Sequence, residues 1–128
     1  MPAKKATGTK RRARPGKKVQ FLQKPNCTTC RKARKFMEGK GFQLYFRDLA
    51  KDRLSASELE KLIGNRDHTE FLNTRNEVYR RNKMKDNPPS RQDAIRMMAE
   101  EPNLIRRPVI LAGGRVVLGF DKDGIARL

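Results

Sequence analysis

The feature that most constrains the fold of this chain is a short apolar run that leads through a turn into two closely spaced cysteines. The run at residues 19–22 predicts a β-strand in the interior of a sheet, and a proline-containing turn follows it. Cys27 and Cys30 then begin a segment whose apolar residues recur at helical spacing, and Asn26 or Thr28 is a suitable cap for that helix. The sequence therefore predicts a strand, a turn and a helix that starts at a Cys-x-x-Cys pair.

The remaining segments predict further strands and helices. Strands are expected at three more places, 42–49, 108–111 and 115–118, and the last two are joined by a tight hairpin at Gly113-Gly114. Helical segments are expected from Ser55 or Ser57 to Gly64, in short pieces over 69–85, from Ser90 to Glu100, and over 121–128. The expected order is strand–helix–strand, then several helices, then strand–strand–helix.

Side-chain patterns within these elements give two more specific expectations. Alternation in the strand at 42–49 turns three apolar residues toward the core, Phe42, Leu44 and Phe46. A capping box fits the following helix at either of two serines, Ser55 with Glu58 or Ser57 with Glu60.

Length and charge limit the classes of protein to which the chain can belong. Its 128 residues suit one domain, and residues 1–18 hold eight of the 31 basic residues and none of the 14 acidic ones. Residues 1–17 cannot bury enough apolar surface to order themselves, so we expect a disordered basic arm ahead of a domain at 18–128. No apolar run reaches the roughly 20 residues of a membrane helix, and the arm lacks the apolar stretch of a secretory signal. We therefore expect a cytoplasmic protein.

Two interpretations of the basic arm remain open. It could be a solvated tail, or its cations could neutralise nucleic-acid phosphates and give salt-dependent binding. Because no aromatic residue is interleaved with these cations, such binding would lack sequence specificity.

The two cysteines exclude some kinds of site and favour another. Two cysteines so close together cannot staple a secreted scaffold, and with the one histidine they cannot supply four zinc ligands. At a helix start, by contrast, unpaired N–H groups and the nearby Arg31 favour a thiolate, the nucleophilic form of cysteine. We therefore interpret Cys27 as an attacking thiolate and Cys30 as the partly buried resolving thiol. The alternative is a small core residue at Cys30 and an incidental surface thiol at Cys27.

Four segments carry a resemblance that reaches beyond the cysteine pair. They are Cys27-Thr28-Thr29-Cys30-Arg31-Lys32-Ala33, Asn73-Thr74-Arg75, Leu104-Ile105-Arg106-Arg107-Pro108-Val109-Ile110 and Val117-Leu118-Gly119-Phe120. In this order they resemble the arsenate reductase/Spx family, and the resemblance covers about residues 18–128. It implies an α/β fold of the thioredoxin-like, glutaredoxin type, in which a mixed sheet is interrupted by a helical insertion.

The resemblance also implies roles for individual residues. Arg107-Pro108 falls where such folds carry a cis proline that faces the active cysteine, and Arg107 would hold an oxyanion or the Cys27 thiolate by charge-assisted hydrogen bonds. Arg75, Pro108 and Arg31 are the expected substrate contacts. The reaction would be reduction of arsenate or of a disulfide, without a resident cofactor or metal. Electrons would come from an external thiol donor such as glutathione, glutaredoxin or thioredoxin.

Family members that reduce arsenate surround the oxyanion with three arginines, and this sequence departs from that pattern. Arg107 matches one of them, but Asn73 and Phe120 stand at the other two positions. Each lost charged contact to a buried anion costs about 1.5–3 kcal/mol. The departure therefore disfavours arsenate as a substrate unless Arg75 or Arg115 substitutes.

The closer resemblance is to the Spx-like branch, which carries the cysteine pair, Thr-Arg, Arg-Arg-Pro, and a glycine followed by an aromatic residue. In that branch the dithiol is a redox switch, and the protein binds the C-terminal domain of the RNA polymerase α subunit. A glycine that the regulator uses for this contact has no match here, because the loop before Phe71 reads Arg66-Asp67-His68. A thiol oxidoreductase and a redox-sensing regulator therefore both remain open.

Overall fold

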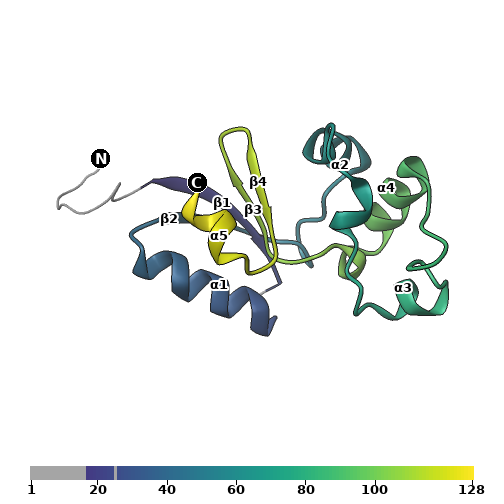
Figure 1. Ribbon diagram of the computed structural model, residues 1–128, viewed down its shortest axis with the longest axis horizontal. Helices are drawn as coiled ribbons and strands as arrows, with labels where there is room; N and C mark the ends of the chain where they lie inside the picture. The colour runs from purple at the N-terminus through teal and green to yellow at the C-terminus, as the bar shows by residue number, and fades with distance from the viewer. Residues whose placement is uncertain (1–16, 25) are drawn as a thin grey trace.

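The computed structural model describes residues 17–24 and 26–128 (Figure 1). The arm predicted at residues 1–17 lies outside the described residues except for Lys17, and so does Pro25 of the predicted turn. The described part forms a sheet flanked by two helices at one end of the molecule and a cluster of helices at the other (Figure 1).

The sheet has four strands in the order β2-β1-β3-β4. The strands are β1 (Lys18–Gln23), β2 (Gln43–Asp48), β3 (Val109–Ala112) and β4 (Arg115–Leu118). β1 pairs parallel with β2 and antiparallel with β3, and β3 pairs antiparallel with β4, so the sheet is mixed. The apolar run of β1 is an interior strand, as predicted, while β2 and β4 form the two edges.

The helices belong to the two ends of the molecule seen in Figure 1. α1 (Thr28–Gly39) and α5 (Lys122–Ala126) lie beside the sheet. The helical insertion between β2 and β3 contains α2 (Ala56–Ile63), the 3₁₀ helix η1 (His68–Phe71), α3 (Glu77–Arg81), α4 (Arg91–Glu100) and the 3₁₀ helix η2 (Pro102–Leu104). This is the predicted order of elements, with small differences at their ends. None of the helices in the described residues combines the length and the apolar character needed to cross a membrane.

Strand alternation divides the apolar side chains between the two faces of the sheet. One face packs against α1 and α5 and contributes Val19, Phe21, Ile110 and Val117. α1 meets this face with Cys30, Ala33 and Met37, which recur at helical spacing and are fully buried. The same periodicity that anchors α1 on the sheet therefore buries the second cysteine.

The other core joins the sheet to the helical insertion. Leu22 of β1 and Val109 of β3 pack with residues of the insertion, including Phe71 and Leu104. Each large apolar side chain buried in this way contributes about 1.5–3 kcal/mol. The backbone adds a further link, because the Arg106 N–H donates to the Phe71 carbonyl over 2.8 Å. The loop after η1 is thereby held next to the segment that enters β3.

One predicted core residue is wrong. Phe46 lies on the same side of β2 as Leu44, but its side chain is 49% exposed. β2 is an edge strand, and the Phe46 ring packs only edge-on against Phe21, with the ring centroids 5.6 Å apart. The remaining half of the ring therefore faces solvent.

The first turn of α2 shows which of the two predicted serines caps this helix. The Ser55 hydroxyl accepts a hydrogen bond from the Glu58 N–H over 3.1 Å, and the Glu58 carboxylate accepts one from the Ser55 N–H over 3.0 Å. This is the predicted capping box, with Ser55 and not Ser57 as the cap. Gly64 ends the helix with a φ of 53°, a conformation that favours glycine.

Candidate active site

Cys27 lies where β1 ends and α1 begins. It occupies the N-cap position of α1, with an extended backbone at φ −84° and ψ 124°. Its N–H donates to the Lys24 carbonyl over 2.9 Å, and its carbonyl accepts from the Arg31 N–H over 3.0 Å. The prediction that Asn26 or Thr28 caps α1 is wrong, because Cys27 itself occupies the N-cap position. Its side chain is placed beside unpaired N–H groups that favour an anion.

Cys30 lies one turn further along α1. Its side chain is fully buried, whereas Cys27 is half-buried, and both are free thiols. Burial, only partly offset by a hydrogen bond to the Lys24 backbone, raises the pKa of Cys30 to about 12. Negative charge on Cys27 acts in the same direction. Cys30 therefore keeps its proton at neutral pH.

The pKa of Cys27 moves the other way. Burial raises it, but hydrogen bonds from the Cys30 backbone, from the Cys30 thiol and from Arg107 outweigh burial, so the pKa is lowered from its ordinary value. These contacts therefore act on the thiolate form, which they stabilise relative to the thiol.

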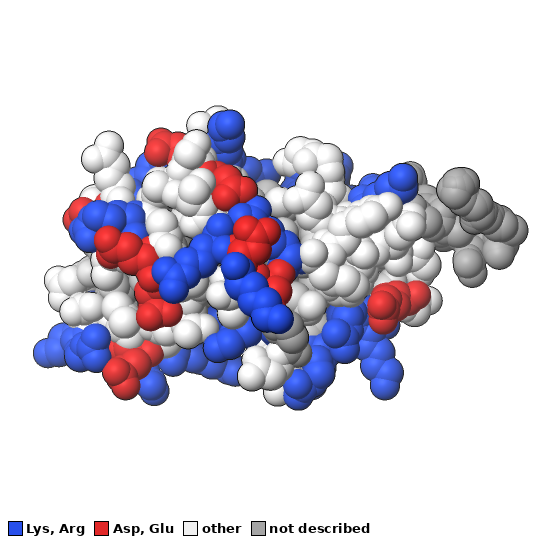
Figure 2. Space-filling model, turned by 180° about the vertical axis from the view of Figure 1, so that it is seen from behind, with Lys and Arg blue, Asp and Glu red and all other residues white. Residues whose placement is uncertain are grey.

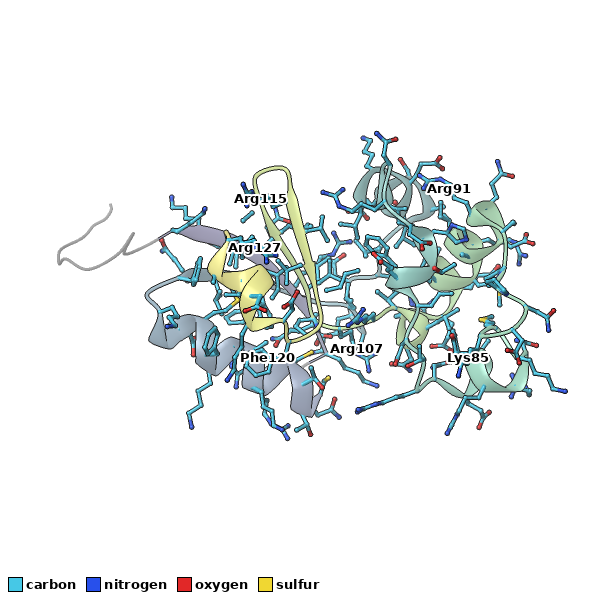
Figure 3. The ribbon with its side chains drawn as sticks, in the orientation of Figure 1. Lys85, Arg91, Arg107, Arg115, Phe120 and Arg127 are labelled. Atoms are coloured by element: carbon cyan, nitrogen blue, oxygen red, sulfur yellow. The ribbon has the colours of Figure 1, made fainter. Side chains whose placement is uncertain are left out.

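Arg107 lies immediately before β3. Its peptide bond to Pro108 is cis, as the resemblance implied. The Arg107 Nη1 donates to Asn103 Oδ1 over 3.2 Å, whereas its buried Nε has no partner among the described residues. Figure 3 places Arg107 between the sheet and the helical insertion, with Phe120 nearby. The structure thus places Arg107 beside Cys27, close enough to lower its pKa.

These side chains line a cleft of about 800 Å³ at the junction of the sheet and the insertion. Of the predicted site residues, Cys27, Arg75 and Arg107 line the cleft, and Cys30 lies beneath Cys27 in the core. Arg31 does not line it; this residue is exposed on α1 and donates to Thr28 Oγ1 over 3.4 Å. Pro108 is also outside the lining and is buried, with its carbonyl accepting from the Gly119 N–H over 2.8 Å.

The cleft contains residues that sequence reasoning missed. Lys24 Nζ donates to Asn103 Oδ1 over 3.1 Å, so one amide oxygen accepts from both Lys24 and Arg107. Arg106 is a further cation in the lining. The cleft therefore has four cations, Lys24, Arg75, Arg106 and Arg107. None of them forms an ion pair with a carboxylate of the described residues. Lys24 could have been found from its position just ahead of the cysteine turn, but no pattern marks Asn103.

Asn73 and Phe120, at the positions of the two missing arginines, both line the cleft. Asn73 is committed to backbone contacts: its Nδ2 donates to the Asn103 carbonyl over 3.0 Å, and its Oδ1 accepts from the Arg75 N–H over 3.1 Å. Phe120 packs edge-on against Phe36, with ring centroids 5.5 Å apart. Arg115 lies on β4 and lines a different pocket, so the expectation that it could replace a missing arginine is wrong.

Comparison with known proteins places this arrangement in a family. A sequence model described as the ArsC family matches residues 22–128. The global transcriptional regulator Spx of Bacillus subtilis is 32% identical over 111 residues, which cover 85% of each chain. A putative ArsC family related protein from Bacteroides fragilis has a similar structure, with a TM-score of 0.75, 26% identity and coverage of 85% of this chain and 95% of that one. A possible arsenate reductase from Streptococcus mutans gives a TM-score of 0.68 at 27% identity, covering 80% and 90%.

The mixed sheet, the helical insertion and the cysteine pair at the start of α1 define a thioredoxin-like protein with a dithiol site. The chain belongs to the arsenate reductase/Spx family, also called the ArsC family. Among the described residues, no three His, Cys, Asp or Glu side chains gather closely enough to hold a metal ion.

Proposed function

We propose that this chain is a thiol-based redox protein in which Cys27 is the nucleophile and Cys30 the resolving thiol. The observation that carries the proposal is the placement of the two thiols one helical turn apart, with Cys27 in the cleft at the start of α1 and Cys30 fully buried, which displaces their pKa values in opposite directions. A lowered pKa supplies thiolate at the cysteine that lines the cleft. A raised pKa keeps the buried cysteine protonated until the second step.

The proposed reaction moves two electrons from the dithiol to an oxidised substrate. The Cys27 thiolate attacks one sulfur of a substrate disulfide, forms a mixed disulfide and releases the other substrate sulfur as a thiolate. Cys30 then loses its proton and attacks the Cys27 sulfur. This closes the Cys27–Cys30 disulfide and releases the second substrate thiolate, and both released thiolates take up protons. An external thiol donor, such as thioredoxin or glutaredoxin with glutathione, would then reduce the internal disulfide.

Arg107 would hold the anionic partner in each step. Its Nε is a buried donor without an acceptor among the described residues, and such a donor costs about 1–3 kcal/mol. A thiolate or oxyanion next to Cys27 would supply the acceptor through a charge-assisted hydrogen bond. Arg75, which also lines the cleft, is the best placed of the remaining proposed substrate contacts, ahead of Arg31 and Pro108.

A disulfide suits the cleft better than arsenate does. Asn73 is tied to the backbone and Phe120 is aromatic, so neither offers a cation to an oxyanion. Two missing charged contacts at about 1.5–3 kcal/mol each correspond to a rate at least about a hundredfold lower for arsenate. The Phe120 ring instead offers an apolar surface to the carbon chain of a thiol or peptide substrate.

Parallel assays of disulfide and arsenate reduction test the proposal. The substrates are bis(2-hydroxyethyl) disulfide and arsenate, each with glutathione and with thioredoxin as donor. We expect disulfide reduction that Cys27→Ser abolishes, while Cys30→Ser accumulates a mixed disulfide on Cys27 that mass spectrometry detects. Ser57→Ala, remote from the cleft, is the control. Equal rates in all variants would contradict the dithiol mechanism, and arsenate reduction as fast as disulfide reduction would contradict the substrate assignment.

A second function, a redox-sensing transcriptional regulator, is favoured by the 32% identity with Spx of Bacillus subtilis. In this role the same dithiol would report redox state, and the partner implied by the family is the RNA polymerase α subunit. A pull-down of purified RNA polymerase with oxidised and with reduced protein separates the two functions. A regulator binds differently in its two redox forms and turns over little disulfide. An oxidoreductase turns over disulfide and binds polymerase in neither form.

The basic arm could add nucleic-acid binding to either the oxidoreductase or the regulator. Except for Lys17, its residues lie outside those that the structure describes, and its charge comes from eight basic and no acidic residues over 1–18. We propose nonspecific nucleic-acid contact by the arm, in a cytoplasmic protein. Removing residues 1–17 should weaken binding to duplex DNA and flatten its salt dependence, because each phosphate contact contributes roughly 0.9 to the log–log slope. Unchanged binding by the trimmed chain would overturn this proposal.

A further inference from the structure

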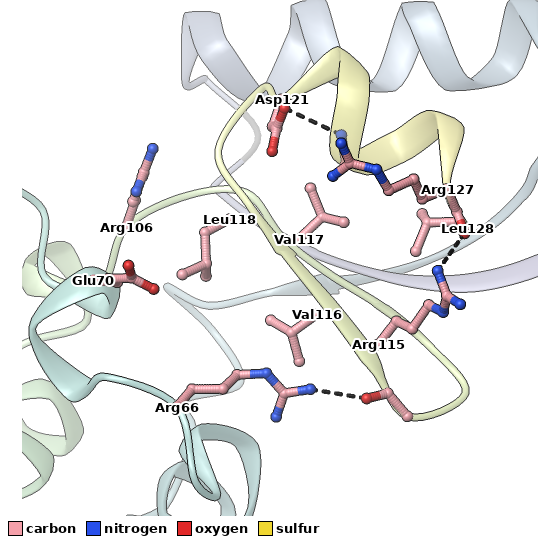
Figure 4. Close-up of a pocket in the computed structure, with 12 residues that line it drawn as sticks. Arg66, Glu70, Arg106, Arg115, Val116, Val117, Leu118, Asp121, Arg127 and Leu128 are labelled. Carbon is pink, nitrogen blue, oxygen red and sulfur yellow. Dashed lines mark hydrogen bonds between the residues drawn. The ribbon is translucent and has the colours of Figure 1, made fainter.

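A second groove, of about 640 Å³, follows the edge of β4 that no strand of the described residues covers, called the free edge below (Figure 4). Val116, Val117 and Leu118 of β4 line it, with Val117 on the α5 face of the sheet and the other two on the face toward the helical insertion. In Figure 4, Arg115 and Arg127 lie on the side of the groove formed by the β3–β4 hairpin and α5, and Arg66 and Arg106 lie on the side of the helical insertion. Nothing in the proposed redox chemistry uses this groove, although Arg106 also borders the Cys27 cleft.

The backbone of β4 offers hydrogen-bonding groups to the groove. In an antiparallel ladder, residue pairs alternate between those that exchange backbone hydrogen bonds and those that do not. Gly119 donates to the Pro108 carbonyl over 2.8 Å, and the two-residue turn makes Ala112 and Arg115 another bonded pair. By this alternation the N–H and C=O groups of Val116 and Leu118 point away from β3. They therefore face the groove at the open edge of the sheet.

The charge of the groove is unbalanced. Its four arginines are exposed, and none of them forms an ion pair with a carboxylate of the described residues. Two of them are held in place by backbone oxygens: Arg66 donates to the Gly114 carbonyl over 2.8 Å and Arg115 to the Arg127 carbonyl over 2.6 Å. Elsewhere on the surface, acidic side chains lie among basic ones, as Figure 2 shows over the helical insertion.

The two acidic residues of the groove do not cancel this charge. Asp121 caps α5 by accepting from the Gly124 N–H over 3.1 Å, and Glu70 is a single exposed carboxylate. A second copy of this chain would bring the same arginines to the groove and be repelled. An acidic segment in extended conformation would meet both the open backbone groups and the arginines.

We propose that the free edge of β4 is a docking site for an extended acidic segment of a partner protein, which adds to the sheet as a fifth strand. Main-chain hydrogen bonds to Val116 and Leu118 would supply the alignment. Charge-assisted contacts from Arg66, Arg115 and Arg127 to the carboxylates of the segment would supply the preference for acidic sequence.

Short peptides test the geometry and the charge separately. The probe is a fluorescently labelled acetyl-Glu-Val-Asp-Val-Glu-amide peptide, titrated with the full chain and followed by anisotropy. We expect saturable binding that weakens with salt, and no binding of the same peptide with lysine at its three acidic positions. Two further peptides carry N-methyl groups, either on both valines or on all three acidic residues. One of these sets must face β4, so at least one methylated peptide should lose binding. Equal binding of all the acidic peptides would overturn the proposal.

Protein variants and amide exchange locate the site. Arg115→Gln combined with Arg127→Gln should raise the Kd about fivefold, the size expected for two charge-assisted contacts at an exposed rim. The control pair, Arg80→Gln with Lys85→Gln, removes the same charge from the α3 region and should leave the Kd unchanged. In the unmodified chain, saturating peptide should slow the exchange of the Val116 and Leu118 amides at least tenfold.

The readouts separate this proposal from its alternatives. Equal weakening by both variant pairs, or unchanged exchange at Val116 and Leu118, would mean that the peptide is attracted only by overall charge and would overturn the proposal. A short single-stranded oligonucleotide that protects the same amides better than the peptide does would also overturn it, by assigning the groove to nucleic acid.

Discussion

Cys27 and Cys30 are the same chemical group one helical turn apart, yet their pKa values move in opposite directions. The difference comes from position, because Cys27 caps α1 at the edge of a cleft while Cys30 is packed in the core beneath it. At the residue scale, the reactivity of each thiol is therefore set by the residues that surround it. Among the cations of the described residues, Arg107 is the one that acts on both thiols.

The contribution of Arg107 can be measured on Cys27 directly. Arg107→Met removes a hydrogen bond and a positive charge from the thiolate, so the pKa of Cys27 should rise. The measurement is the rate of iodoacetamide alkylation against pH; Cys30 does not interfere, because it is buried and its pKa is about 12. Arg106→Met, which removes a cation from the rim of the same cleft, is the control. An unchanged alkylation profile in Arg107→Met would remove Arg107 from the site.

The two displaced pKa values also predict how the stability of the reduced protein depends on pH. The lowered pKa of Cys27 means that the unfolded chain binds more protons between the lowered pKa and the ordinary value of about 9, so stability rises with pH across that interval. The raised pKa of Cys30 has the opposite sign, and its contribution is lost as pH rises from about 9 toward about 12.

Urea unfolding of the wild type, Cys27→Ser and Cys30→Ser in the presence of reductant checks both signs. The stability of the wild type relative to Cys27→Ser should grow with pH up to about 9. Relative to Cys30→Ser it should fall above about 9. Parallel curves for all three proteins would contradict the assigned pKa directions.

At the scale of single elements, the capping box of α2 gives a prediction with a built-in control. Ser55→Ala removes the hydroxyl that accepts from the Glu58 N–H and should lower the free energy of unfolding by about 1 kcal/mol. Ser57→Ala changes an exposed residue inside the same helix and should leave stability unchanged or slightly higher. Urea denaturation at neutral pH measures both. A larger loss in Ser57→Ala would mean that the helix begins later than the structure shows.

The sequence predicts those elements whose local signals agree with their packing. The apolar run of β1, the Ser55 box and the glycine turn of the β3–β4 hairpin are local signals, and the structure confirms them. The prediction that Phe46 lies in the core is wrong, because strand alternation gives the direction of a side chain but not what covers it. No sequence pattern identifies Asn103, because its contact with Lys24 joins residues that are 79 positions apart in the chain. The position of the cysteine pair at the start of a helix is predictable because both cysteines belong to one local segment of the chain.

At the scale of the whole molecule, the Cys27 cleft exists because two cores meet. The core on the α1 face holds the cysteines, and the core of the helical insertion carries the loop with Asn73 and Arg75 to the segment before β3. Sheet and insertion each contribute part of the lining, so a change in their relative position would alter the surroundings of Cys27.

Brief oxidation of the native chain tests directly whether Cys27 is the nucleophile and Cys30 the resolving thiol. The chain is treated with oxidised glutathione, quenched by alkylation and analysed by mass spectrometry of its peptides. We expect an internal Cys27–Cys30 disulfide in the wild type and a single glutathione on Cys27 in Cys30→Ser. We expect no adduct on Cys30 in Cys27→Ser, because that thiol is buried and protonated. Glutathione on Cys30 of that last variant, or no internal disulfide in the wild type, would contradict the assignment of nucleophile and resolving thiol.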